Sequence, residues 1–234
     1  MIDLGSTDFV LSIPSLPEPE LERLSGLLFD SWESFVESSL SIPDYSLFLQ
    51  VEEGSIKGAA KIGAFLATVY FGIGNYGDFV SGLKTINEQL NVTREYLAEH
   101  AGHVFSCPDF RTSTRKRGGS LASLERLFVK VQKGELTPDE ALAQAEALLG
   151  DESTTVPGFQ RDLEHALRNC PHFPQQLALP LGELGEDDLH ELDKPKRPAQ
   201  PPRPRPPLES ALQFRVEVWR ESKKKHKQTR VVRL

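Results

Sequence analysis

Cysteine and methionine are scarce in this chain. Its 234 residues include two cysteines, Cys107 and Cys170, and a single methionine. Two cysteines form at most one disulfide, which excludes the class of small secreted domains that several disulfides stabilise. The composition therefore predicts a fold held together by a hydrophobic core, in a reducing compartment such as the cytosol.

Catalytic signatures and a secretion signal are also missing. The sequence contains no nucleophile elbow, Walker loop, HExxH pair, Cys-x-x-Cys pair or kinase motif. Gly72 to Gly77 fits G-x-G-x-x-G, but the residues before it look helical and no parallel sheet is predicted, so a dinucleotide site is not expected. The first residues show no basic stretch followed by an apolar run, which predicts no secretory signal. We expect a protein without enzyme activity and without a cofactor.

Zinc-ligand side chains are present, but their spacing is loose. They are His100, His103, Cys107, His165, Cys170 and His172. Structural zinc sites usually show two tight pairs of ligands, which this set does not form. We therefore predict histidines at helix ends and a buried thiol, and no metal site.

Charge is unevenly distributed. The formal net charge is -7, yet residues 182–193 are acidic and residues 208–234 carry eight lysines and arginines against three glutamates. The overall charge therefore predicts nothing about nucleic acid. The basic C-terminal end could bind an anionic partner or be a solvated turn.

The spacing of apolar residues, helical in some segments and alternating in others, predicts an α+β fold that is mainly helical. An N-terminal strand–helix–strand unit (1–55) comprises a strand at 8–13, a helix at 18–38 and a strand at 45–51. Further along are a helical hairpin and a short helix (121–180), an acidic and proline-rich linker (181–207) and a basic β-hairpin (208–234). A hairpin alone is marginal in water, so we expect this one to extend a small antiparallel sheet or to exchange between subunits.

The helical hairpin has strong local signals. Gly134 is placed to end its first helix, and Thr137, Pro138 and Glu140 form a capping box at the start of its second. The stretch LERLFVKVQKGELTPDEALAQAEALL resembles SHOCT-type modules, although its second helix is richer in alanine. That resemblance implies an oligomerisation or interaction element.

The most apolar part of the chain is residues 56–83, predicted as a long glycine-rich helix. An amphipathic helix is expected to continue from it, so that the two together span residues 56–107. Sixteen consecutive positions, 62–77, carry no charge. The length of this run lies between that of a typical buried core helix and that of a membrane span. Small residues recur at four-residue steps in two rows, one at Ala60, Ala64, Thr68 and Gly72 and the other at Gly74, Asp78 and Gly82. Such rows let helices approach closely, so the residues expected to pack helices are Ala60, Ala64, Gly72, Gly74, Gly77 and Gly82. In a membrane, the embedded Thr68, Asn75 and Asp78 are expected to line a pore.

A basic loop is predicted at 108–120. Its cations, expected to bind an anionic ligand, are Arg111, Arg115, Lys116 and Arg117. A solvated linker is the alternative.

Residues 45–107, from the Val51-Glu-Glu-Gly-Ser entry to the ending Asn75-Tyr-Gly-Asp-Phe, resemble small transmembrane effectors of bacterial anti-phage operons (CBASS- or Hailong-type). The resemblance implies a homo-oligomeric inner-membrane channel with cytoplasmic domains, gated by a nucleotide or oligonucleotide. The alternative is a soluble, cytoplasmic interaction protein that uses the SHOCT-like hairpin and the proline-rich tail to recruit a protein partner.

Overall fold

The computed structural model describes residues 1–11, 15–53, 56–105, 113–173 and 213–234. These residues form six strands and seven helices, which confirms the predicted α+β class. The elements are β1 (Ile2–Leu11), α1 (Glu18–Ser39), β2 (Ser46–Glu52), β3 (Ile56–Ala64), α2 (Leu66–Gly74), α3 (Phe79–Val104), β4 (Ser113–Gly118), α4 (Ser120–Gln132), α5 (Pro138–Leu149), α6 (Glu152–Thr155), α7 (Pro157–Arg168), β5 (Phe214–Arg220) and β6 (Gln228–Arg233). Cys107, Arg111 and the predicted linker at 181–207 lie outside the described residues.

All six strands belong to one antiparallel sheet, in the order β4-β1-β3-β2-β5-β6. The C-terminal hairpin, β5 and β6, joins the sheet through β2, where Leu49 lies opposite Val218. This confirms that the hairpin extends the sheet beside the strand predicted at 45–51. The first and last strands of the chain therefore share one hydrophobic core.

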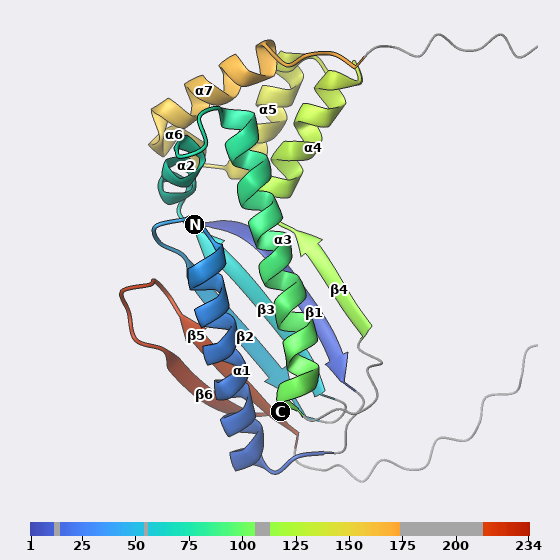
Figure 1. The fold of residues 1–234 in the computed structure, drawn as a ribbon, viewed down its shortest axis with the longest axis vertical. Helices are drawn as coiled ribbons and strands as arrows, with labels where there is room; N and C mark the ends of the chain where they lie inside the picture. The colour runs from blue at the N-terminus through green and yellow to red at the C-terminus, as the bar shows by residue number, and fades with distance from the viewer. Residues whose placement is uncertain (12–14, 54–55, 106–112, 174–212) are drawn as a thin grey trace, which may run out of the picture.

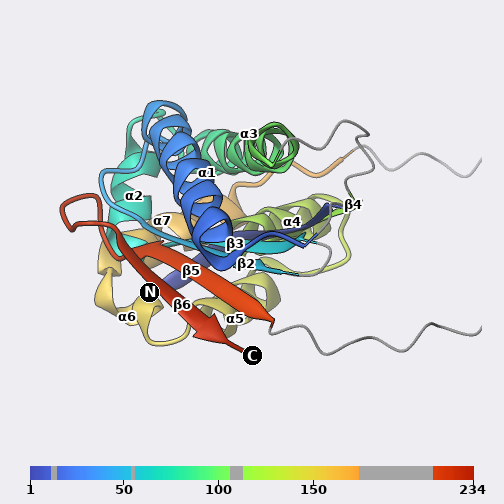
Figure 2. The ribbon, with the colours of Figure 1, turned by 90° about the horizontal axis from the view of Figure 1, so that it is seen from below.

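The sheet is covered by α1 and α3 on one face (Figures 1 and 2). Alternate strand residues point toward these helices and are buried with the aromatic side chains of α1: Phe9, Leu47, Leu49, Val51, Val216, Val218, Phe29 and Trp32. The opposite face carries exposed cations from β3 and β4, including Lys57, Lys61 and Arg115. Helices α4 to α7 stand beyond one end of the sheet, next to α2 (Figure 1).

The basic turn between β5 and β6 docks on acidic residues of α1. Lys223 lies 3.4 Å from Glu37, and Lys227 pairs with Asp30. Asp44, which lies between α1 and β2, also holds the start of the turn. Its carboxylate accepts a hydrogen bond of 2.8 Å from the backbone N–H of Lys223. Much of the basic charge that was predicted to bind an anionic partner therefore pairs with carboxylates of the chain itself.

The predicted long glycine-rich helix is wrong. Residues 56–83 form β3, α2 and the first turn of α3, with a chain reversal between the two helices. In β3 the side chains alternate: Ile56 and Ile62 are buried, whereas Lys57 and Lys61 are exposed. A period of two is typical of a strand. The small residues suit β3 because it is a central strand, with β1 on one side and β2 on the other.

No helix among the described residues is long and apolar enough to cross a membrane. The most apolar helix, α2, has nine residues, so it is about 14 Å long at about 1.5 Å per residue, whereas the hydrocarbon core of a bilayer is about 30 Å thick. The uncharged run is divided between a strand and this short helix. The prediction of a membrane-inserting channel is therefore wrong, and the inner-membrane location inferred from it is withdrawn.

The described part of the predicted basic loop, residues 113–118, is the edge strand β4. Cations along an edge strand hinder pairing with the edge of another sheet, because the strand would have to bring like charges together. Arg117 faces the opposite side from Lys116 and lies 3.5 Å from Asp8 of β1. The basic run therefore has a structural role in addition to any binding.

Tyr45 supplies a test of the core. Its side chain is buried, and its hydroxyl has no hydrogen-bond partner among the described residues. Burial, and then the nearby Glu37, raises the pKa of Tyr45 above its usual value. As the pH rises, the unfolded state releases this proton first, so the stability present below about pH 10 is lost above it.

At about pH 8, Tyr45→Phe should therefore unfold at nearly the same urea concentration as the parent protein. At about pH 11, the variant should unfold at a higher urea concentration than the parent. Urea unfolding at the two pH values measures the difference. An identical loss of stability in both proteins at high pH would contradict this assignment.

Candidate functional site

Helix α2 keeps two large aromatic side chains in solvent. Phe71 is 65% exposed and Phe65, which precedes the helix, is 58% exposed. The opposite side of the helix buries Leu66, Val69 and Ile73 in the core. Both sides of α2 thus carry apolar side chains, although those on one side are largely exposed. Exposed aromatic side chains on an apolar surface are typical of contacts with partner proteins.

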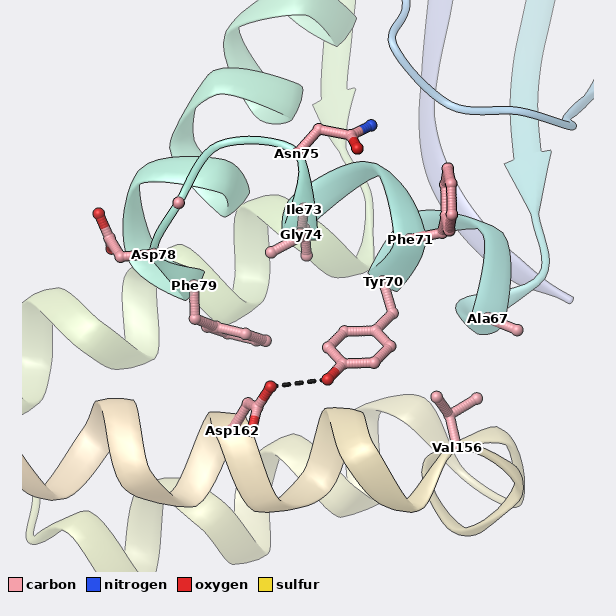
Figure 3. A pocket seen from close by; sticks show the side chains of 11 residues that line it. Ala67, Tyr70, Phe71, Ile73, Gly74, Asn75, Asp78, Phe79, Val156 and Asp162 are labelled. Carbon is pink, nitrogen blue, oxygen red and sulfur yellow. Dashed lines mark hydrogen bonds between the residues drawn. The ribbon is translucent and has the colours of Figure 1, made fainter.

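A hollow of about 560 Å³, lined in part by Phe71, lies between α2 and α7 (Figure 3). Tyr70 points from α2 toward Asp162 of α7, and Phe79 lies beside it. Val156, just before α7, faces α2 from the other side, whereas Phe71 and Asn75 point away from α7. The volume is within the range of about 300–1,000 Å³ seen for ligand sites.

The chain reversal before α3 shapes this hollow. Asp78 caps α3 by accepting a hydrogen bond of 2.9 Å from the backbone N–H of Ser81. Gly77 has a φ of +84°, which glycine adopts without strain. Gly82 then lets α3 approach the backbone of Ile73 closely. The tight packing of α2 on α3 places Phe79 next to Tyr70.

Aromatic packing holds α7 in place opposite α2. The ring of Phe159 is buried, and its centroid lies 5.8 Å from that of Tyr70 and 5.3 Å from that of Phe79, with edge-to-face geometry. Pairs of this kind contribute about 0.5–1.5 kcal/mol beyond the buried area. The wall of the hollow is therefore already formed before any partner binds.

A hydrogen bond polarises the base of the hollow. The Tyr70 hydroxyl donates to Asp162 Oδ2 at 2.6 Å. This bond raises the pKa of Tyr70 and lowers the pKa of Asp162. The phenol stays protonated at neutral pH, so it acts as a hydrogen-bond donor and is a poor nucleophile.

The lining of the hollow contains two carboxylates, Asp78 and Asp162, and no cation from the described part of the chain. Arg161, which is largely exposed, contacts the other oxygen of Asp162 at 3.2 Å. The hollow is consequently apolar with a carboxylate at two of its borders. An apolar side chain that is followed by a positive charge complements it.

The residues predicted to line a pore lie in and around α2. The Thr68 hydroxyl donates to the carbonyl of Phe65, the residue before α2, at 2.7 Å. Asn75 follows the last residue of α2, and Asp78 caps α3. Because the described residues contain no membrane-spanning helix, a pore-lining role has no basis here. Asn75 and Asp78 instead border the hollow.

The small residues predicted to pack helices have different positions. Ala60 and Ala64 lie in β3. An added Cβ at Gly72 would lie 2.9 Å from the Ser41 carbonyl oxygen, whereas one at Gly74 would meet nothing within 4 Å. Gly72 and Gly82 allow close approach, but between elements of this chain.

The basic residues predicted to bind an anion are separated by the strand geometry of β4. Arg115 and Arg117 lie on the open face of the sheet, whereas Lys116 lies on the other face, 2.8 Å from Glu95 of α3. Lys116 also lines a second cavity with Arg94, a residue that was not predicted. Arg94 comes four residues after Leu90 and three before Leu97, which places a charge on an apolar helix stripe. A charged residue on an apolar stripe is the sequence feature from which Arg94 could have been found.

The histidines of α3 pack with aromatic side chains. His100 stacks on Tyr96, with ring centroids 5.0 Å apart. Burial and the neighbouring His103 lower the pKa of His100. Within the described ranges, no three ligand-type side chains are grouped to hold a metal ion.

Comparison with family models, curated proteins and solved structures gives no match for this chain. The resemblances to SHOCT-type hairpins and to anti-phage effectors therefore stay predictions. The hairpin geometry itself is as expected, because α4 and α5 are joined by a tight turn and Thr137 and Glu140 form the capping box. Function has to be argued from the site.

Proposed function

We propose that this protein is a non-enzymatic interaction protein that binds a protein partner with α2 and the hollow beside α7. The observation that carries the proposal is the exposure of Phe71 at the border of a preformed apolar hollow. Phe65, just before α2, adds a second exposed aromatic side chain at this helix. Large apolar side chains on a surface cost solubility, and aromatic residues contribute most to binding at interfaces. The scarcity of cysteine favours a cytosolic setting.

The partner is expected to present an apolar side chain close to a lysine or arginine. The apolar group fits between Tyr70, Phe79 and Val156, and the cation is attracted to Asp162. The helical hairpin supports this surface indirectly, because α5 packs against α7 and thereby holds the wall that faces α2.

Peptide selection on the purified full chain tests the proposal. Enriched peptides should combine an aromatic or long aliphatic residue with a neighbouring lysine or arginine. Phe71→Ala should weaken the selected peptides by about tenfold or more, the size expected for an aromatic residue at an interface. Phe173→Ala is the matched control, because Phe173 is an exposed phenylalanine (51%) outside the hollow.

Asp162→Asn separates the two parts of the recognition. It keeps an acceptor for Tyr70 and should reduce the preference for a basic residue without removing apolar binding. Equal effects of Phe71→Ala and Phe173→Ala would contradict the proposal. Sedimentation that shows self-association, abolished by Phe71→Ala, would also overturn it and make a second copy the occupant.

A further inference from the structure

A second cavity, of about 550 Å³, lies between α3, β4 and α4 and shares no lining residue with the hollow at α2. These three elements meet at the side of the molecule away from β5 and β6 (Figure 1). The residues that decide its chemistry are Asn87, Asn91, Arg94, Lys116, Arg126 and Lys130. All six are polar or positively charged, in contrast to the apolar lining of the hollow at α2.

Arg94 is the central feature of this cavity. Its side chain is only 3% exposed, and its guanidinium donates to three neutral oxygens. Nε donates to the Leu90 carbonyl at 2.9 Å, Nη1 to the Arg117 carbonyl at 2.8 Å, and Nη2 to Asn91 Oδ1 at 2.8 Å. A guanidinium has about five N–H groups, so these bonds leave two of them available.

Among the described residues, Arg94 has no anionic partner in direct contact. No carboxylate in the described part of the chain forms an ion pair with Arg94, and Asp3 and Glu95 act only through longer-range attraction. Burial lowers the pKa of Arg94, but a guanidinium keeps its charge in proteins. A buried charge without a counter-ion is costly, which points to an anion that binds there.

The backbone of β1 makes room for the guanidinium. Gly5 has a φ of +142°, and the pairing of β1 with β3 shifts its register between Asp3 and Gly5. A Cβ at Gly5 would lie 2.8 Å from Arg94 Nη1. Bulges of this kind often adjust a strand next to a functional site. The position of Arg94 is therefore set by two elements.

Asn87 provides a second, independent observation. It is 7% exposed and lines the cavity. Its Nδ2 donates to Glu125 at 2.5 Å, but its Oδ1 has no hydrogen-bond partner in the part of the chain that the structure describes. A buried acceptor without a donor is unfavourable. A ligand that carries an N–H or O–H group would satisfy it.

The cavity as a whole is positive. Its lining contains five cations, Arg94, Lys116, Arg126, Lys130 and Lys133, and two carboxylates, Glu125 and Glu135. Lys116 pairs with Glu95 outside the lining, and Lys133 lies 4.0 Å from Glu135. Arg126 and Lys130 are exposed and have no ion pair within the described residues. A small anion entering the cavity meets charges that are still available.

We propose that this cavity binds a small organic phosphate. The phosphoryl group accepts hydrogen bonds from the free N–H groups of Arg94 and from Arg126, in the manner in which guanidinium groups bind phosphate oxygens. A hydroxyl or amino group of the same molecule donates to Asn87 Oδ1. Lys116 adds charge at the β4 side, so one of the basic residues predicted to bind an anion contributes, although the central residue comes from α3.

Calorimetric titration of the full chain tests this site with nucleoside 5′-monophosphates, the corresponding nucleosides and inorganic phosphate. We expect saturable binding of at least one nucleoside monophosphate, at least tenfold tighter than that of inorganic phosphate, and no binding of the nucleosides. Arg94→Gln should abolish binding. Because Arg94 is buried and this variant could unfold, its circular dichroism and melting temperature are compared with those of the parent.

Arg126→Gln keeps the test valid if Arg94→Gln fails to fold. Arg126 is exposed, so its replacement should leave the melting temperature unchanged and weaken binding by about tenfold. Arg115→Gln is the matched control, because Arg115 is an exposed arginine on the other side of β4. The proposal is overturned if no monophosphate binds, if inorganic phosphate binds as tightly, or if Arg115→Gln has the same effect as Arg126→Gln.

Discussion

Replacement of Gly58 by alanine should lower the free energy of unfolding by about 3 kcal/mol, at the upper end of the usual cost of overpacking. Gly58 lies directly opposite Phe9 in the pairing of β1 with β3. An added Cβ would lie less than 3.0 Å from three carbons of the buried Phe9 ring. The ring has little room to move, because Phe9 is fully buried in the core. Urea unfolding followed by the fluorescence of the two tryptophans, Trp32 and Trp219, measures the change.

A double-mutant cycle shows whether this contact is the cause. Phe9→Leu alone removes a buried ring and should itself be destabilising. In the Phe9→Leu background, however, Gly58→Ala should cost much less, because the atoms that it would meet are gone. If the cost of Gly58→Ala is the same in both backgrounds, the proposed clash between Phe9 and the alanine is not responsible.

Gly82→Ala should be the second most damaging of these replacements, with a loss of about 2–3 kcal/mol. A Cβ at Gly82 would lie less than 3.0 Å from the carbonyl oxygen and the Cα of Ile73. These are backbone atoms of α2, so relief requires α2 and α3 to separate. That movement would also disturb Tyr70 and Phe79 in the hollow.

Gly74→Ala is the control for this replacement. It lies in the same apolar segment, at the end of α2, and an added Cβ would meet nothing within 4 Å. Its melting temperature should be unchanged or slightly higher, because alanine restricts the unfolded chain more than glycine does. Thermal unfolding of both variants decides the matter: equal losses would mean that the contact of Gly82 with Ile73 is unimportant.

Several elements could be predicted because their signals are local. The capping box of Thr137 and Glu140 lies within four residues, and the alternation of β5 lies within seven. The helix from Glu18 follows Pro17 and has a stripe of leucines and aromatic residues. In each case the residues that form the element also contain the information for it.

Other features could not be predicted, because the residues that determine them are distant in the chain. β3 contains small residues that suit a strand or a close-packed helix, and the pairing with β1 and β2 decides between them. The basic run of β4 is a strand only because β1 offers it an edge. The same holds for the cavity, where Arg94 depends on Gly5 and on the Arg117 carbonyl.

Spacing, capping and alternation over short ranges were enough to predict the α+β class, the helical hairpin and the C-terminal β-hairpin. Tertiary packing fixed how the apolar segment is divided, that Phe71 and the preceding Phe65 are exposed, and that Arg94 is buried with no ion pair among the described residues. Those features arise from backbone pairing and side-chain packing between distant segments. A side chain is exposed or buried according to which other elements reach it.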